Sequence, residues 1–195
     1  SKYIKTTEQA KIIRTILKES FPKVKFSVRS DSYSGGSSID VSWLDGPNKN
    51  QVDSVLSMLS GSYFDSMIDY KGLREHVMNG ERVSFSADFI FCERSFSSEL
   101  IDKSISAVYK KYMTLFKNQG HEKPMAKEFK NGSLFNVYLD NSGRSVQELV
   151  SKNVNKRSTF PFVCESKTRD KIAFVGDEGY GESAQGKVNH LRAVK

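Results

Sequence analysis

Hydrophobic and polar residues alternate on both sides of a pair of glycines near position 35. The segments 24–29 and 39–43 both switch strictly between apolar and polar residues. Such alternation is typical of strands with one buried and one solvent-facing side. The polar stretch Asp31–Ser37 between them holds turn formers and two glycines that accept positive φ. The sequence therefore predicts a β-hairpin from Val24 to Pro47, with a loop longer than the tight two-residue turns.

Apolar residues at helical spacing predict a helix on each side of this hairpin. The first helix spans residues 6–21, and Thr6 and Gln9 form a capping box at its start. The second spans residues 45–61, with an aspartate as its N-cap and a proline in its first turn. Gly61 suits a left-handed C-terminal cap for it.

The next part of the chain completes an α+β pattern. A short strand is expected over residues 63–69, and Asn79-Gly80 is a strong turn signal. Residues 83–91 alternate so regularly that they predict the clearest single strand of the chain. A long helix follows over 97–120. The order is α-β-β-α-β-β-α, which predicts an α+β fold with an antiparallel sheet covered by helices.

The remaining residues predict a small C-terminal α/β extension. Residues 118–132 are polar and lysine-rich, as in a linker, and a capping box starts a short helix over 145–154. Strands are expected at 134–139, 159–164 and 171–175. These elements either form a small subdomain or extend the first sheet, and their small number favours the second interpretation.

Two domains are predicted from this pattern, with a boundary near residue 120. Residues 1–120 form the α+β domain, and residues 121–195 form the extension. Within the extension, residues 176–182 are glycine-rich and acidic, which predicts a mobile loop whose spacing does not fit an EF-hand. Residues 186–195 predict a flexible basic tail.

Composition and charge limit the classes of function. The net charge is +7, and the pI is near 9.3, but the lysines are scattered along the chain. This excess permits a nucleic-acid partner without requiring one. Cys92 and Cys164 stand in apolar runs, as buried thiols of a cytosolic protein do. No apolar run reaches the roughly 18 residues of a membrane span, and no signal peptide is visible, so we expect a cytoplasmic protein without membrane contact.

The sequence contains no recognisable motif for catalysis, metal binding or cofactor binding. His76, His121 and His190 lie far apart and lack the H-x-x-x-H or C-x-x-C companions of a metal site. The serines are not tied to a base by any nucleophile motif, and no phosphate-binding loop precedes a helix. We therefore predict no catalytic residues, no metal and no cofactor. No pattern sets the oligomeric state.

Three segments together resemble one of the large polyvalent-protein-associated domains. They are K-F-S-V-R-S-x-S-Y-S-G-G-S-S-I-D-V-S-W-x-D-G-P in the predicted hairpin, F-D-S-M-I-D at 64–69, and V-S-F-S-A-D-F-I-F-C-E-R at 83–94. The likeness spans roughly residues 6–112, and the hairpin is its most specific part. Domains of this family are α+β modules of phages, plasmids and conjugative elements. The resemblance implies a role in assisting invasion of a host, against restriction or CRISPR defences, and it carries over no catalytic residue.

The hairpin is the best candidate for a binding site. Its solvent-facing side and loop present one set of polar residues: Lys25, Arg29, Tyr33, Ser34, Gly35, Gly36 and Asp40. In the functional interpretation they bind a polar surface or a phosphate. In the structural interpretation Arg29 and Asp40 form a cross-strand ion pair of little energetic value, and the glycines only turn the chain.

A second set of charged residues follows the predicted strand 83–91. Asp88, Glu93 and Arg94 either flank a cleft or are solvated charges at the end of a strand, and the sequence favours the second interpretation.

Three hypotheses for function follow, in order of preference. The first is a non-enzymatic protein of a phage or plasmid that inhibits a host defence complex, of anti-CRISPR or anti-restriction type, by protein–protein binding. The alternative is a protein that binds DNA or RNA and protects the incoming genome. The third is an enzyme that acts at the face of the hairpin.

Overall fold

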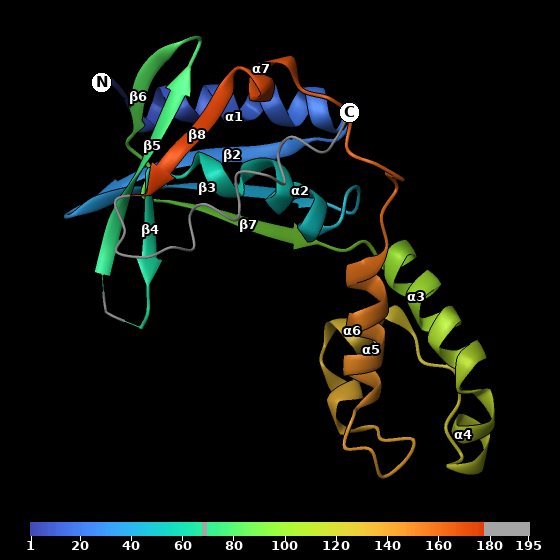
Figure 1. The fold of residues 1–195 in the computed structure, drawn as a ribbon. Coiled ribbons are helices and arrows are strands. Elements are labelled where there is room, and N and C mark those ends of the chain that lie inside the picture. The colour runs from blue at the N-terminus through green and yellow to red at the C-terminus, as the bar shows by residue number, and fades with distance from the viewer. Residues whose placement is uncertain (68–69, 178–195) are drawn as a thin grey trace. The chain divides into compact units, whose positions relative to one another are not determined.

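The computed structural model describes residues 1–67 and 70–177, and these residues pack into two compact units (Figure 1). The first unit combines residues 1–43 and 50–93 with the described residues from Phe162 onward. The second combines residues 44–49 with 94–161. These are units of packing. The predicted boundary near residue 120 concerns domains that fold independently, and it stays a prediction.

The predicted hairpin is present in the first unit, but its turn is shorter than expected. It consists of β2 (Phe26–Tyr33) and β3 (Gly36–Leu44), and β3 also pairs with β7 (Phe89–Ser95) in a three-stranded sheet. The antiparallel register runs from Phe26 opposite Trp43 to Tyr33 opposite Gly36. Only Ser34 and Gly35 connect the two strands, so the predicted long loop is wrong. Gly35 has a φ of 93°, which lets the chain reverse within two residues.

A second, mixed sheet completes the strands of the first unit. Its strands are β1 (Lys2–Ile4), β6 (Glu81–Phe85), β5 (Tyr70–Met78), β4 (Ser62–Asp65) and β8 (Ile172–Asp177). Along this sheet β1 pairs parallel with β6, while β5 pairs antiparallel with β6, β4 and β8. The turn predicted at Asn79-Gly80 is confirmed, since both residues have positive φ between β5 and β6.

The single strand predicted over 83–91 is wrong in one important respect. The chain forms β6 up to Phe85, leaves the second sheet, and forms β7 of the three-stranded sheet from Phe89 onward. The predicted α+β class is confirmed, but the strands form two sheets instead of one. The alternation that predicted one long strand is shared by two strands in different sheets.

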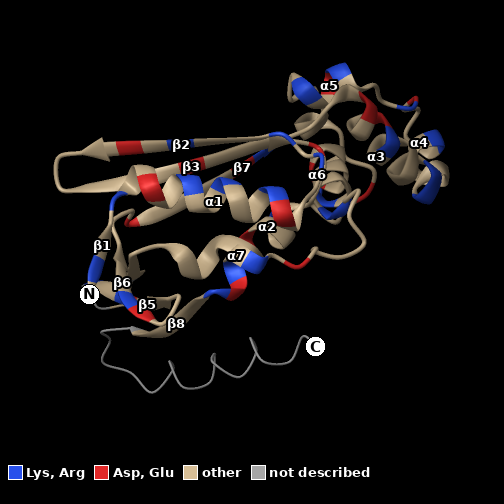
Figure 2. Cartoon of the chain, turned by 90° about the horizontal axis from the view of Figure 1, so that it is seen from above, with Lys and Arg blue, Asp and Glu red and all other residues tan. Residues whose placement is uncertain are grey.

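Helices α1 (Thr6–Ser20) and α2 (Lys49–Leu56) lie on one face of the three-stranded sheet, and strands of the second sheet lie beyond them (Figure 2). The core between these layers is apolar. Its buried side chains include Ile13, Ile16, Leu17, Val28, Ile39, Val41, Trp43, Val52, Leu56 and Leu59. The sheet side chains in this set come from the apolar half of the predicted alternation, which therefore correctly assigned the buried face of the hairpin.

The predicted capping box at the start of α1 is wrong, because Gln9 has a different role. The N-cap is Lys5, without a side-chain hydrogen bond to the helix. Gln9 is 1% exposed; its Nε2 donates to the carbonyl of Leu59 at 2.7 Å, and its Oε1 accepts from the backbone N–H of Ala87 at 2.9 Å. The side chain thus satisfies two backbone groups in the core, where the chain passes between the sheets.

Two further predictions near α2 are wrong for reasons of packing. Gly61 does not have positive φ; a Cβ there would lie 1.9 Å from the carbonyl oxygen of Phe85, so close backbone approach requires glycine. Asp45 does not cap α2, which begins at Lys49. Its carboxylate accepts a hydrogen bond from the backbone N–H of Ser97 at 2.8 Å.

The described residues after Phe162 belong to the first unit. Glu19 of α1 accepts hydrogen bonds from Ser166 and Thr168, at the start of the short helix α7 (Lys167–Asp170). Strand β8 then pairs with β5, which confirms the strand predicted at 171–175 and extends a sheet of the first unit. Positions 178–182 of the predicted acidic loop and the predicted tail 186–195 lie outside the described residues.

The second unit is helical. It contains α3 (Ser98–Lys111), α4 (Met113–Asn118), α5 (Ala126–Lys130), the 3-10 turn η2 (Ser133–Asn136) and α6 (Val146–Lys156). The predicted helix 97–120 is interrupted at Tyr112, which has φ −111° and ψ 22°. The capping box of α6 is confirmed, with Ser145 and Glu148 exchanging hydrogen bonds.

Other predictions for this unit are corrected by the structure. The strand expected at 134–139 is η2 and an irregular segment, and 159–164 forms no strand. The predicted linker contains α5. The core that holds these pieces comprises Ile101, Ile105, Val108, Phe116, Leu134, Leu139, Val146 and Val150. Hydrophobic packing therefore keeps the irregular segments in place without a sheet.

We predict that Gln9→Ala destabilises the protein by about 2–4 kcal/mol, because it leaves the Leu59 carbonyl and the Ala87 N–H buried without partners. Chemical denaturation measures this loss. Thr7→Ala, on the exposed side of the same helical turn, is the control and is expected to change stability by less than about 0.5 kcal/mol. Equal effects of the two substitutions would contradict the assigned role of Gln9.

Candidate functional site

The candidate site is the side of the three-stranded sheet that faces away from α1 and α2. Its exposed residues include Ser27, Arg29, Asp31 and Tyr33 from β2, Asp40 from β3, and Phe91 and Glu93 from β7. We call this surface the polar face. It exists because residues in a strand alternate between two sides, and the apolar residues of β2 and β3 are turned to the helices.

A shallow pocket of about 440 Å³ lies on the polar face. It is lined by Ser27, Arg29, Asp40, Val41, Ser42, Phe91, Cys92 and Glu93. Its charged residues are one guanidinium and two carboxylates, and its aromatic residue, Phe91, is 54% exposed. The ring of Phe91 stacks on that of Phe89, with 5.8 Å between the ring centroids. The pocket thus combines an arginine, carboxylates and an accessible aromatic surface.

Arg29 and Asp40 come together in this pocket. They are directly opposite each other in the register of β2 and β3, and both side chains are exposed. Within the described part of the chain, no salt bridge joins them. Their charged groups are therefore accessible to a partner.

The other predicted site residues lie elsewhere on the hairpin. Tyr33, Ser34 and Gly35 are exposed at its tip, and Lys25 is exposed just before β2. None of them lines the pocket. Gly36 is partly buried, and a Cβ there would lie 2.4 Å from Oδ2 of Asp88, so its glycine is explained by packing. A role of these residues in binding stays a prediction.

Phe91 is the residue that the sequence analysis missed. The alternation over 83–91 assigned it to the buried face together with Val83 and Phe85. Val83 and Phe85 are indeed buried in β6, but the chain changes sheets before β7, and Phe91 then faces solvent. No local signal marks this change, because Asp88 occupies a polar position of the alternation, as Ser84 and Ser86 do. Glu93, placed at the end of the predicted strand, does line the pocket.

Asp88 is not a solvated charge. Its side chain is 13% exposed and forms a 2.9 Å salt bridge with Lys71 of β5. The carboxylate also accepts hydrogen bonds from the Ser62 hydroxyl at 2.8 Å and from the backbone N–H of Ser37 at 3.3 Å. These contacts join the start of β3 to two strands of the second sheet.

The contacts of Asp88 determine its ionisation. Burial acts to raise its pKa, but the hydrogen bonds from Lys71, Ser62 and Ser37 together outweigh burial, and the pKa of Asp88 lies below its ordinary value. The carboxylate is thus held in its charged form under the tip of the hairpin.

Arg94 also has a structural role. Its Nε donates to the carbonyl of Asp45 at 2.8 Å, and its Nη2 approaches the carbonyl of Gly46 at 3.4 Å. Burial lowers the pKa of Arg94, and the nearby Asp45 opposes this shift. The guanidinium remains charged and ties the segment before α2 to the end of β7.

The histidines and cysteines do not assemble a reactive site. His76 is buried, its Nε2 donates to the carbonyl of Met58, and its ring contacts those of Phe85 and Phe174. In residues 1–67 and 70–177, no cluster of three His, Cys, Asp or Glu can hold a metal. Cys92 and Cys164 are partly exposed rather than buried as predicted, and neither forms a disulfide. His190 lies outside the described residues.

No helix in the described part of the chain has the length and apolar character of a membrane span.

The structure is an α+β domain. Helices α1 and α2 cover one side of its three-stranded sheet, and the polar face is the other side. Residues 4–97 match the family model described as large polyvalent protein associated domain 29, so the resemblance drawn from the sequence is confirmed. The match covers slightly less than half of the chain and ends in the connection between β7 and α3. This match associates the protein with phages and other mobile elements. Comparisons with curated proteins and with solved structures found no match.

We predict that Asp88→Asn lowers stability by about 1–3 kcal/mol at pH 7, because a charged hydrogen-bond acceptor is lost. The folded-state pKa of Asp88 is depressed, so its contribution is present above the ordinary aspartate pKa of about 3.9. That contribution disappears as pH falls through the depressed value. The difference between wild type and variant should therefore shrink on acidification.

Denaturant unfolding at neutral and acidic pH measures this difference. Asp31→Asn removes a carboxylate that is exposed on β2, and it serves as the control with an expected change below about 0.5 kcal/mol. A wild-type–to–Asp88→Asn difference that does not vary with pH would contradict the role given to the carboxylate.

Proposed function

We propose that this protein is a non-enzymatic accessory protein of a phage or plasmid that inhibits a host defence complex by binding it through the polar face. The family match supports the setting in a mobile element. The observation that carries the binding mode is the uncovered pocket that contains Arg29 together with Asp40, Glu93 and Phe91. A restriction or CRISPR complex is the type of target that the family suggests.

The composition of the polar face favours a protein partner. Arginine and accessible aromatic side chains are enriched among the residues that contribute most to protein–protein binding. Here Arg29 is exposed, Phe91 is 54% exposed, and Tyr33 is 48% exposed. Charged residues of both signs allow complementary contacts that select one partner over others.

The same face is poorly suited to nucleic acid. Asp31, Asp40 and Glu93 are exposed on it and would repel phosphate groups. The alternative function, protection of DNA or RNA by direct binding, is supported by a different part of the molecule, where positive charge is concentrated. The third hypothesis, an enzyme at this face, stays a prediction, since the pocket contains the carboxylates of Asp40 and Glu93 but no histidine or lysine.

An infection assay tests the proposed function. Host cells with an active restriction or CRISPR system express the chain, and plaque formation by a phage that the system targets is measured. We expect expression to increase plaque formation. Arg29→Glu and Phe91→Ser should each reduce this protection, because loss of a central interface residue typically weakens binding by about tenfold or more.

Lys11→Glu provides the matched control for Arg29→Glu. It makes the same reversal of charge in the same unit, on an exposed position of α1, and should leave protection unchanged. All variants are compared for folding by circular dichroism. If Lys11→Glu abolishes protection as fully as Arg29→Glu does, net charge rather than the polar face explains the activity, and the proposal fails.

A further inference from the structure

The positive charge of this protein is concentrated in the second unit. Its residues 44–49 and 94–161 contain 13 Lys and Arg and 7 Asp and Glu, which gives a net charge of +6 out of +7 for the whole chain. The blue segments of the ribbon recur on α3, α4, α5 and α6 (Figure 2). The charge that appears scattered along the sequence is therefore a property of one helical unit.

A groove between α3 and α6 collects four of these cations. Its volume is about 250 Å³, and its lining residues are Ala107, Val108, Lys111, Tyr112, Arg144, Leu149, Lys152, Asn153 and Lys156. The lining includes no carboxylate. Since the groove contains only positive charges, its electrostatic potential favours an anion.

The four cations are available for binding. Their side chains are all exposed, and in the described part of the chain none forms a salt bridge. Elsewhere in the same unit, Lys103 is bound to Glu99 at 2.9 Å. Asp140 does not line the groove; its pKa is lowered by hydrogen bonds from Ser142 and, to a smaller extent, by the charge of Arg144.

The groove lies between two helices that share one hydrophobic core. Its floor includes buried Val108, and α3 and α6 pack against each other through the core of this unit (Figure 1). On α6, Lys152 and Lys156 are four residues apart, so they lie on one side of the helix about 6 Å from each other along its axis. The groove therefore presents its positive charges beside two helices that pack against each other.

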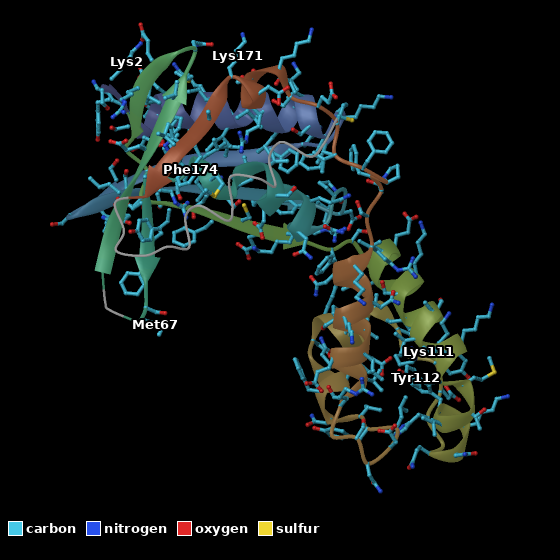
Figure 3. The ribbon with its side chains drawn as sticks, viewed as in Figure 1. Lys2, Met67, Lys111, Tyr112, Lys171 and Phe174 are labelled. Atoms are coloured by element: carbon cyan, nitrogen blue, oxygen red, sulfur yellow. The ribbon has the colours of Figure 1, made fainter. Side chains whose placement is uncertain are left out.

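Tyr112 adds an aromatic surface at the junction of α3 and α4. Its ring is partly exposed, and Nζ of Lys111 lies 5.3 Å from the ring centroid (Figure 3). Aromatic rings beside lysines offer a stacking surface for bases and sugars next to contacts for phosphates. The interruption of the predicted long helix at Tyr112 places this ring at the groove.

We infer that the groove between α3 and α6 is a nucleic-acid site that binds the phosphate backbone through Lys111, Arg144, Lys152 and Lys156. The lining has no large exposed apolar side chain, whereas interfaces with proteins need an apolar centre. Interfaces with nucleic acid are instead polar and strongly positive. Base-edge contacts are not needed for such binding, so the site recognises the backbone and not a sequence.

Fluorescence anisotropy with a labelled DNA single strand and with the corresponding duplex tests this inference. The full chain is titrated between about 50 mM and about 200 mM salt. Four phosphate contacts predict a slope of log affinity against log salt near −3.6 for the duplex and about −2.8 for the single strand. The form that binds more tightly identifies the preferred nucleic acid.

Substitutions locate the site. Lys152→Gln with Lys156→Gln should weaken binding about tenfold and reduce the steepness of the slope by about 2, and Arg144→Gln, which lies outside any helix, should reduce it by about 1. Lys123→Gln with Lys127→Gln removes the same charge from exposed positions that do not line the groove, and should have little effect. Circular dichroism and thermal unfolding confirm that each variant is folded.

Three results would overturn the inference. The first is affinity that does not depend on salt, or no binding at low salt. The second is an equal loss in the Lys123/Lys127 control, which would assign binding to overall charge. The third is displacement of DNA by polyglutamate at equal charge concentration, which would indicate an acidic protein partner. The infection assay tests other residues, Arg29 and Phe91. Failure of the nucleic-acid inference would therefore not contradict the proposed function.

Discussion

The fold of the first unit depends on hydrogen bonds to one backbone segment in its core. In this segment the chain passes from the second sheet to the three-stranded sheet. Between β6 and β7 the chain crosses the interior at Ala87, whose side chain is fully buried. There its N–H donates to Gln9, and its carbonyl accepts from the N–H of Gly61 at 2.7 Å. Without these partners, two polar groups would remain in an apolar core. One buried glutamine and one glycine therefore permit the two-sheet architecture.

The candidate binding face is a consequence of this crossing. Asp88, the next residue, fixes the start of β3 through the N–H of Ser37 and connects it to the second sheet through Ser62 and Lys71. After the crossing, β7 turns Phe91 and Glu93 to the same side as Arg29. The chemistry of the polar face is thus created by elements from two separate parts of the sequence, which the partly buried carboxylate of Asp88 connects.

The two units differ in the partner that their surfaces suit. The first unit carries nearly balanced charge, and its polar face combines arginine, carboxylates and aromatic rings, as protein interfaces do. The second unit carries most of the positive charge, and its groove presents cations without carboxylates. The two proposals therefore assign a defence protein and a nucleic acid to separate sites on the molecule.

The sequence by itself determined the hairpin, its buried side, the α+β class, the strand β8 and the capped helix α6, because alternation and capping act between residues close in the chain. It also brought Arg29 and Asp40 forward as candidates. The tertiary structure alone decided that residues 83–91 divide between two sheets and that Gln9 bonds Ala87 instead of capping α1. It also gathered Lys111 and Lys156 in one groove. These features depend on contacts between residues distant in sequence, for which a local pattern contains no signal.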